Sequence, residues 1–471
     1  MKMTQKIKDL FSNLKTQITN LKTNQTVLVC AFLTLIYLIS GYCKWIEIAV
    51  SVCALVFMSI LPLQKAFCIF MFLHSFTLSN IGYDSCYMVT QIGFCLILLV
   101  KYILGVKKGD YKFYKKIALT IGWFIAISVT ISLFKPFYRG AWMYFIYFAL
   151  IYLFFAMRKE FKISQGMNFM FGGLITSCAA AAVSIFFPYF QYQVINGSRF
   201  LAFFNCTNYL YMRAMFVLAY YMYRNLNKNM SHFKFAIIYA LCAIITLTTL
   251  SKTGIAMLAL FTLIYLVLFL KQNFKKRIKF VAILLVFVAI LCLICHKLIL
   301  SVWDRFAKSF ESNDFWGSLL TGRDLIWELY SKAIFKNPFT ALFGHGMLHE
   351  QIFIASIFGP TETHNFYLFL LYRFGIVGTI FLGYIVYLFI KELGYAKPKL
   401  IAWLPLIFIL LESFCDNTHR CYNFTYFIFA VMILFMSQKE IEEPIQPHKK
   451  MVNNEKTLTA AENETMENTK N

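Results

Sequence analysis

The chain has little charge, and most of that charge is of one sign. Only 14% of its 471 residues are Asp, Glu, Lys or Arg, whereas soluble domains carry about 25%. The 22 acidic residues are outnumbered by 45 Lys and Arg residues, and 60% of the chain is hydrophobic. This composition excludes an ordinary soluble domain and predicts an all-α polytopic membrane protein.

No contiguous basic surface is visible behind the net charge of +23. Lys and Arg form short clusters between apolar runs, as membrane anchors do, so we expect membrane lipids and no nucleic acid as partners. The 13 cysteines lie mostly inside apolar runs, where they act as small hydrophobic side chains. No Cys/His arrangement in the sequence is taken to indicate a metal, so no metal or other cofactor is predicted. Cys415 and Cys421 flank a short outer segment and are candidates for a disulfide.

The two ends of the chain lack long apolar runs. Residues 1–25 have no apolar core of the kind that a cleavable signal needs. Their apolar residues recur at helical spacing between lysines, which fits an amphipathic helix on the cytoplasmic leaflet, although a disordered basic tail fits equally well. Residues 438–471 are polar, mixed in charge and poor in aromatic side chains, so we expect a disordered cytoplasmic tail.

Between these ends, residues 26–437 form a predicted membrane domain with about 12–14 spanning helices. Lys and Arg are concentrated in alternate connecting segments, and the positive-inside rule then places both termini in the cytoplasm. The same rule places residues 299–364, the one long polar break in the chain, outside the membrane as a large helical loop. The candidate spans are 27–43, 45–62, 66–82, 86–106, 117–134, 140–157, 168–187, 208–223, 235–250, 254–270, 280–298, 365–390, 400–414 and 421–437.

The large outer loop carries an arginine and a histidine in positions suited to chemistry. Residues 321–336 have a helical pattern that Pro338 closes, with Arg323 in the first turn. A helix start and a guanidinium together bind anions such as a diphosphate, although Arg323 is also placed to pair with Asp324 or a lipid headgroup. His364 lies where the loop re-enters the membrane. It is a candidate general base, and an interfacial histidine bonded to backbone is the alternative.

Other outer segments add polar groups. Gly344 and Gly346 flank His345, and this pair predicts either a close backbone approach to a ligand or a plain turn. Arg199, Asn208 and Lys252 lie in two further outer segments, where cations bind phosphate and the amide binds sugar hydroxyls; a snorkelling arginine is the alternative reading of Arg199.

Two more arginines lie in apolar context. Buried charge in a membrane is costly, so we expect Arg213 and Arg373 to line a wet cleft open to the outside. Arg213 is close enough to Asn208 along a helix to reach the interface instead.

In this order and on this face, the segments resemble the O-antigen ligase/polymerase superfamily, whose members are polytopic glycosyltransferases with a GT-C-like fold. The resemblance covers about residues 190–390. Departures from the family pattern are Ala202 for glycine, Thr207 for proline and Lys252 for arginine, and Arg373 stands where an acidic residue is common. The matching motifs are Arg199 to Asn208; Ser251-Lys252-Thr253-Gly254; Gly322-Arg323 followed by Trp327; Gly344-His345-Gly346; His364-Asn365-Phe366-Tyr367-Leu368; and Gly375-Ile376-Val377-Gly378.

The resemblance implies an enzyme that acts on undecaprenyl-diphosphate-linked oligosaccharides at the outer face of the bacterial cytoplasmic (inner) membrane. It implies that Arg199 and Arg323 hold the lipid diphosphate while His364 activates an acceptor hydroxyl. The transfer would proceed with inversion and without a metal, and the outer segments show no Asp-x-Asp motif. We expect catalytic roles for these three residues and substrate-binding roles for Lys252, Asn208, Asn365, Gly344 and Gly346.

Polymerase and ligase activities both remain open. A polymerase joins repeat units into capsular or O-antigen polysaccharide, whereas a ligase moves the glycan onto another acceptor, such as the lipid A core of lipopolysaccharide. The divergent sequence, rich in Lys, Ile, Phe and Asn, favours a polymerase with a chain-length regulator and a flippase as expected partners. A polysaccharide flippase is the competing class, but the chain shows no internal repeat and has a long outer loop that a transporter does not need.

Overall fold

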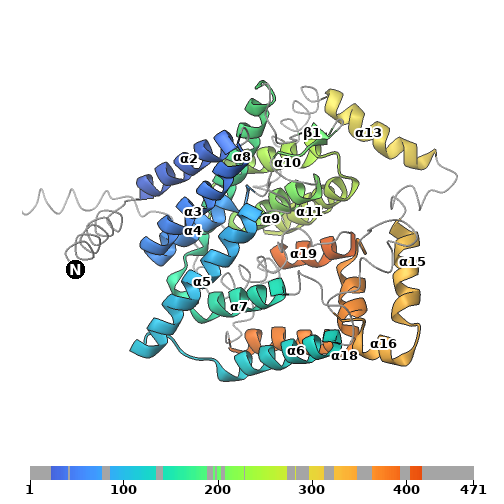
Figure 1. The fold of residues 1–471 in the computed structure, drawn as a ribbon. Helices are drawn as coiled ribbons and strands as arrows, with labels where there is room; N and C mark the ends of the chain where they lie inside the picture. The colour runs from blue at the N-terminus through green and yellow to red at the C-terminus, as the bar shows by residue number, and fades with distance from the viewer. Residues whose placement is uncertain are drawn as a thin grey trace, which may run out of the picture.

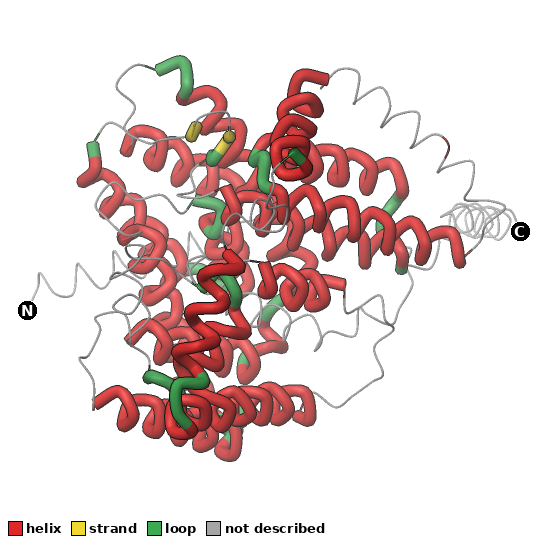
Figure 2. The backbone as a smooth tube through the Cα atoms, turned by 90° about the vertical axis from the view of Figure 1, so that its right-hand side faces the viewer, coloured by secondary structure: helices red, strands yellow, loops and turns green. Residues whose placement is uncertain are grey.

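A computed structural model of the protein describes residues 23–40, 43–76, 85–133, 142–187, 195–196, 199–202, 207–227, 229–272, 282, 296–311, 323–346, 363–392 and 404–415. Within these ranges the chain is helical, apart from connecting turns and one pair of two-residue strands (Figure 2). The predicted all-α fold is confirmed.

The first part of the chain forms a bundle around a short buried helix. In chain order its helices are α2 (Thr23–Ser40), α3 (Lys44–Ile60), α4 (Leu63–Leu73), α5 (Ser85–Lys108), α6 (Lys115–Leu133), α7 (Trp142–Ala156), the 3-10 helix η1 (Arg158–Glu160) and α8 (Ile163–Ser184). The side chains of α4 are nearly all buried, because α2, α3 and α8 pack around it. Gly173 lets α8 approach closely, since a Cβ there would collide with the backbone of Phe72.

The central helix of the second part is α9 (Thr207–Leu226), which is almost completely buried. It packs against α8, α10 (His232–Thr248), α11 (Lys252–Gln272) and α19 (Leu404–Cys415). Before α9, β1 (Ile195–Asn196) pairs antiparallel with β2 (Arg199–Phe200).

The outer loop and the helix after it contain α13 (His296–Phe310), α15 (Arg323–Ile334), α16 (Pro338–Phe343) and α18 (Phe366–Glu392). The sequence predicts that Pro338 closes the helix that starts near Arg323. The structure corrects this, because α15 ends at Ile334 and Pro338 begins α16. Asn337 caps α16 by accepting a hydrogen bond from the Thr340 backbone, and proline suits a first helical turn, where its missing N–H costs nothing.

The helix α18 is not one straight span. Gly375 has φ 63° and ψ −173°, a non-helical conformation in the middle of the helix. The part before Gly375 lies beside α15, and the part after it runs along α6 (Figure 1). The predicted span 365–390 therefore begins with a segment that packs on the outer loop.

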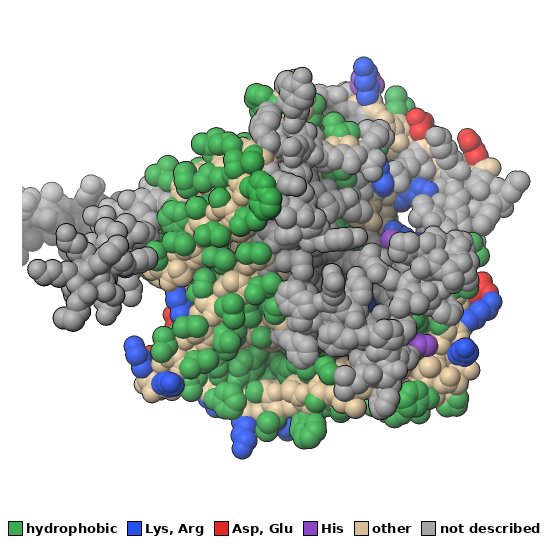
Figure 3. All heavy atoms as spheres, viewed as in Figure 1, with side chains coloured by type: hydrophobic (Ala, Val, Ile, Leu, Met, Phe, Trp, Pro, Cys, Tyr) green, Lys and Arg blue, Asp and Glu red, His purple; other side chains and the backbone are tan. Residues whose placement is uncertain are grey.

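Four described helices are long and apolar enough to cross a membrane: Val89–Lys108, Ile163–Ser184, Lys252–Lys271 and Phe366–Glu392. Five shorter apolar helices fall on other predicted spans. Hydrophobic side chains cover the side formed by the first helices, as expected of a lipid-facing surface (Figure 3). Residues 1–22, Cys421, the span 421–437, the tail 438–471 and most of the span 280–298 lie outside the described residues, so the predicted total of 12–14 spans stays a prediction.

Candidate functional site

His364 is held by its two neighbours in the chain. The Thr363 carbonyl accepts a hydrogen bond of 3.0 Å from Trp327 Nε1, which fastens this point of the loop to α15. The Asn365 side chain accepts hydrogen bonds from the backbones of Tyr367 (3.0 Å) and Leu368 (3.1 Å), and so caps α18. Between them, His364 has φ 46°, and its side chain is half-buried. Backbone of this kind is uncommon outside glycine and concentrates at functional positions.

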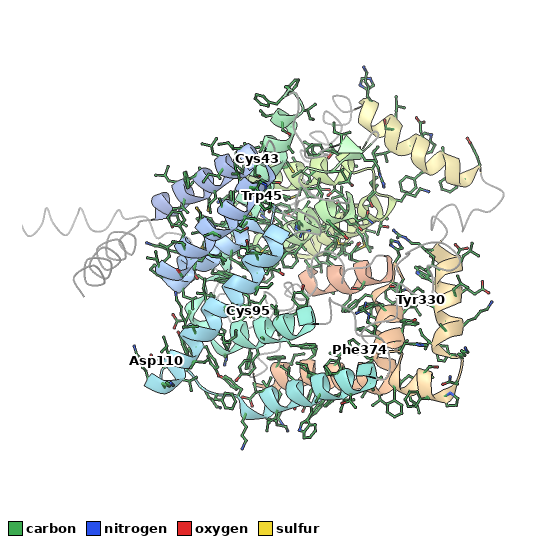
Figure 4. All side chains as sticks on the ribbon, in the orientation of Figure 1. Cys43, Trp45, Cys95, Asp110, Tyr330 and Phe374 are labelled. Atoms are coloured by element: carbon green, nitrogen blue, oxygen red, sulfur yellow. The ribbon has the colours of Figure 1, made fainter. Side chains whose placement is uncertain are left out.

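Arg323 is the first residue of α15 and lies one helical turn before Trp327. Residues four apart lie close together on a helix, so Arg323 lies on the side of α15 whose Trp327 bonds to the Thr363 carbonyl. Tyr330, three residues further on, lies between α15 and α18 and meets Tyr372 edge-to-face, with 5.0 Å between the ring centroids (Figure 4). The sequence-predicted arginine and histidine therefore belong to one packed unit.

The segment Gly344–Gly346 donates hydrogen bonds to carbonyls of α18 at its kink. The backbone N–H of His345 donates to the Tyr372 carbonyl (2.7 Å), and that of Gly346 donates to the Arg373 carbonyl (3.0 Å). In an unbroken helix these carbonyls bond to N–H groups four residues on, and the kink at Gly375 interrupts that pattern. The backbone of this segment thus lies against α18. Contact with a ligand at these glycines stays a prediction.

His345 has a structural environment. Its ring stacks on Tyr372 with 4.4 Å between centroids, and its Nε2 lies 3.1 Å from the Ala333 carbonyl. These contacts join α15, α18 and the loop after α16. His364 is therefore the better candidate for a general base of the two histidines.

A second group of predicted residues lies where α9 and α11 begin. The Ser251 hydroxyl donates to Asn208 Oδ1 (3.1 Å) and accepts from the Gly254 backbone (3.3 Å), so it links the two helix starts beside Lys252. Gly254 allows the Tyr211 ring to lie against α11, because a Cβ there would come within 2.7 Å of that ring. Asn208 and Lys252 are both half-buried and adjacent.

The helix α19 joins the two groups. Its Glu412 carboxylate is buried and accepts a hydrogen bond from the Tyr211 hydroxyl of α9. Its Leu410 carbonyl accepts from the Tyr367 hydroxyl (2.9 Å), three residues after His364. Sequence reasoning missed Glu412, although an acidic residue inside an apolar span is itself a signal of function. Figure 3 shows Lys or Arg and His side chains in a hollow on the outer-loop side of the molecule.

Arg199 lies in β2, opposite Asn196 across the hairpin, and is half-buried. Ala202, the second residue after β2, is buried and has φ 50°. Glycine adopts this conformation without strain, which explains why glycine is usual there in the family that the sequence resembles. The place of Arg199 in the site stays a prediction.

The two remaining arginines differ from each other. Arg213 is completely buried and donates to the carbonyls of His74 (3.0 Å) and Tyr209 (2.9 Å), so it joins α9 to the end of α4 and does not reach the interface. Arg373 lies before the kink of α18, with its guanidinium 4.3 Å from the Phe369 ring centroid. A small pocket with His74, Tyr37 and Phe70 in its lining lies within the first bundle.

Residues 236–383 match the family model described as O-antigen ligase. The matched segment runs from α10 into α18 and contains Lys252, Arg323, Gly344, Gly346, His364 and Asn365. This match supports the resemblance to the O-antigen ligase/polymerase superfamily. A search of curated proteins found no match.

Members of the O-antigen ligase family act on lipid-linked oligosaccharides in the membrane. The match supports a membrane enzyme of the glycosyltransferase type, and the apolar helices support a multi-pass membrane protein. Arg199 and Asn208 precede the matched segment. Among the residues that the structure describes, no group of three or more His, Cys, Asp or Glu side chains is arranged to hold a metal ion.

Proposed function

We propose that the protein polymerises polyprenyl-diphosphate-linked oligosaccharide repeat units at the outer face of the bacterial cytoplasmic membrane. The observation that carries this proposal is the junction at His364. There the outer loop, the start of α15 and the start of α18 are bonded together through Thr363 and Asn365. A family match over the same segment supports the substrate class.

In this proposal His364 is the general base. It removes the proton from a sugar hydroxyl at the end of the acceptor unit, and that oxygen attacks the anomeric carbon of the donor. The bond between this carbon and the phosphate oxygen breaks, the electron pair leaves with the polyprenyl diphosphate, and the anomeric configuration inverts. A half-buried histidine with restricted backbone is suited to this step, because proton transfer requires a base held within hydrogen-bond reach.

Arg323 and Arg199 stabilise the leaving diphosphate. An anion at a helix start that carries an arginine gains two favourable interactions. It accepts hydrogen bonds from the free N–H groups of the first turn, and the guanidinium binds it through two parallel charged hydrogen bonds. Arg323 begins the helix that bonds to the residue before His364, so in this proposal charge develops near this cation as the bond breaks. No metal is required in this scheme, since the arginines and Lys252 supply the positive charge.

Lys252, Asn208 and Asn365 position the substrates. Asn208 Oδ1 accepts from Ser251, and Asn365 Oδ1 caps α18, so the amide NH₂ groups are the parts of these side chains that would contact sugar. Contacts of this kind orient the acceptor hydroxyl and contribute through proximity.

The test is polymer length in cells that lack the gene and carry wild-type, His364→Ala or His296→Ala protein. His296 is an exposed histidine on α13 and serves as the matched control. The proposal expects long chains with wild type and His296→Ala, and single repeat units with His364→Ala at equal membrane levels. Full-length polymer from His364→Ala would refute the role of this histidine.

Ligase activity is the second candidate, because the matched family model is described as O-antigen ligase. The same gel separates the two activities. Long chains that accumulate on the lipid carrier in the deletion strain identify a ligase, and single units identify a polymerase. Glycan retained on the cytoplasmic side would contradict both and identify a flippase.

A further inference from the structure

The outer loop carries large apolar side chains that point away from the protein. Phe335 at the end of α15 is 62% exposed, and Phe339 and Leu342 on α16 are 61% and 42% exposed. We call these three residues the α16 surface. Grouped exposed apolar side chains on a folded protein mark a surface that contacts another apolar phase or a partner.

The α16 surface is continuous with the lipid-facing side of α18. A Cβ at Gly375 would lie 2.5 Å from the Gly344 nitrogen and would also collide with the Leu342 backbone, so α16 is pressed against the kink. Directly after the kink, α18 exposes Ile376, Val377 and Ile380. The apolar surface of the spanning part of α18 therefore extends onto α16.

The charged residues of this segment are placed as they are in segments that lie at a bilayer surface. Between Phe335 and Gly346 the only Lys, Arg, Asp or Glu is Lys336, which is exposed. When aromatic side chains insert into a bilayer, a neighbouring lysine can reach the headgroups with its ammonium while its stem lies along the apolar region. A carboxylate in this segment would oppose insertion, and the sequence has none.

We propose that the α16 surface inserts into the outer leaflet of the bilayer, with Phe335, Phe339 and Leu342 among the acyl chains and Lys336 at the headgroups. The membrane then holds the segment that leads to Gly344–Gly346, and through its bonds to the Tyr372 and Arg373 carbonyls it holds the first part of α18. This inference concerns lipid contact and does not depend on the reaction that the protein catalyses.

The test uses tryptophan as a depth probe. The variants Phe339→Trp and Glu328→Trp are placed in nanodiscs of phosphatidylcholine, with or without bromine on the acyl chains. Glu328 is exposed on α15 and pairs with Lys332 away from the α16 surface. The seven native tryptophans contribute equally to both variants and to the parent protein, so their emission is subtracted.

We expect brominated chains to remove most of the added emission of Phe339→Trp and to leave that of Glu328→Trp. Unquenched emission at long wavelength would place residue 339 in water and overturn the proposal. Unquenched emission at short wavelength would show cover by protein, such as a second copy of the chain, and would also overturn it. Phe335→Trp repeats the measurement at a second position in case Phe339→Trp fails to fold.

Discussion

Replacing Gly375 with alanine should separate the outer loop from the membrane domain. Gly375 and Gly344 face each other, and both have extended backbone with positive φ, at 63° and 74°. A Cβ on Gly375 would lie 2.5 Å from the Gly344 nitrogen, and one on Gly344 would lie 2.6 Å from the Gly375 nitrogen. The obstruction is backbone on both sides, so no side-chain rotation relieves it.

The expected loss of stability has two sources. Alanine in this region of φ and ψ, which is almost restricted to glycine, costs about 1–3 kcal/mol. Moving the two backbones apart also removes the bonds from His345 and Gly346 to α18, each of which contributes about 0.5–1.5 kcal/mol. The sum is about 2–6 kcal/mol, which is a large fraction of the stability of a folded domain.

The assay is thermal unfolding in nanodiscs, with Gly383→Ala as the matched control. Gly383 lies later in α18, and a Cβ there meets nothing within 4 Å. Alanine is the better helix former, by about 1 kcal/mol, so this control should melt at or above the wild-type temperature. We expect Gly375→Ala to melt several degrees lower and to lose polymer synthesis. Equal melting of the two variants would refute the reasoning that the kink holds the loop.

Three further changes test single contacts. Tyr211→Phe removes the hydroxyl that bonds to the buried Glu412 carboxylate. A buried acceptor that loses its donor costs about 1–3 kcal/mol, so the melting temperature should fall. An unchanged melting temperature would contradict the contact. Trp327→Phe removes the bond that holds the residue before His364. Because the buried Thr363 carbonyl loses its donor, we expect melting to fall as for Tyr211→Phe and turnover to fall about tenfold; normal turnover with lowered melting would indicate a purely structural role. The lysine one turn after Glu328 donates a hydrogen bond to it and lowers its pKa, so any stabilisation is present above the ordinary glutamate pKa and is lost as pH falls through the lowered value. Because this pair is exposed, Glu328→Gln should melt like wild type at neutral pH, and a clear drop would show that the pair is more than a surface contact.

Composition and periodicity predicted the helical membrane fold, because hydrophobic periodicity reports burial directly. The same pattern predicted a helix over 321–336 with Arg323 in its first turn, where α15 spans Arg323–Ile334, and it predicted the loop–helix junction at His364. The segment Gly375-Ile376-Val377-Gly378 reads as an uninterrupted apolar run, however, and hydropathy contains no term for backbone conformation. The kink depends on Gly344, which approaches from another part of the chain, so local sequence did not indicate it.

The candidate site was predictable in its residue types and less so in its connections. Cations and one histidine stand out in an apolar chain, and each was identified by residue type and position. The link between the α9–α11 group and the α15–α18 group depends on α19, where Glu412 lies in a segment that reads simply as a span. Tyr211 likewise reads as one aromatic side chain among many, and its contact with Glu412 arises only when α9 and α19 pack together.

The arrangement of α18 explains why an outer loop and a membrane domain form one site. Tyr330, Ala333, Ile334 and Tyr372 form a small apolar cluster that is separate from the main core. Arg323 begins the helix α15 that contributes to this cluster, and the residue before His364 bonds to the same helix, whereas Asn208 and Lys252 lie at the starts of α9 and α11. The two groups are connected through α19, by the bond from Tyr367 to Leu410 and the bond from Tyr211 to Glu412. In the proposed reaction, a general base and a leaving-group cation on one packed unit would keep their mutual geometry even if that unit shifted relative to the membrane domain. Transfer between two lipid-linked chains would need that property, because both substrates must enter a site whose reacting groups stay aligned.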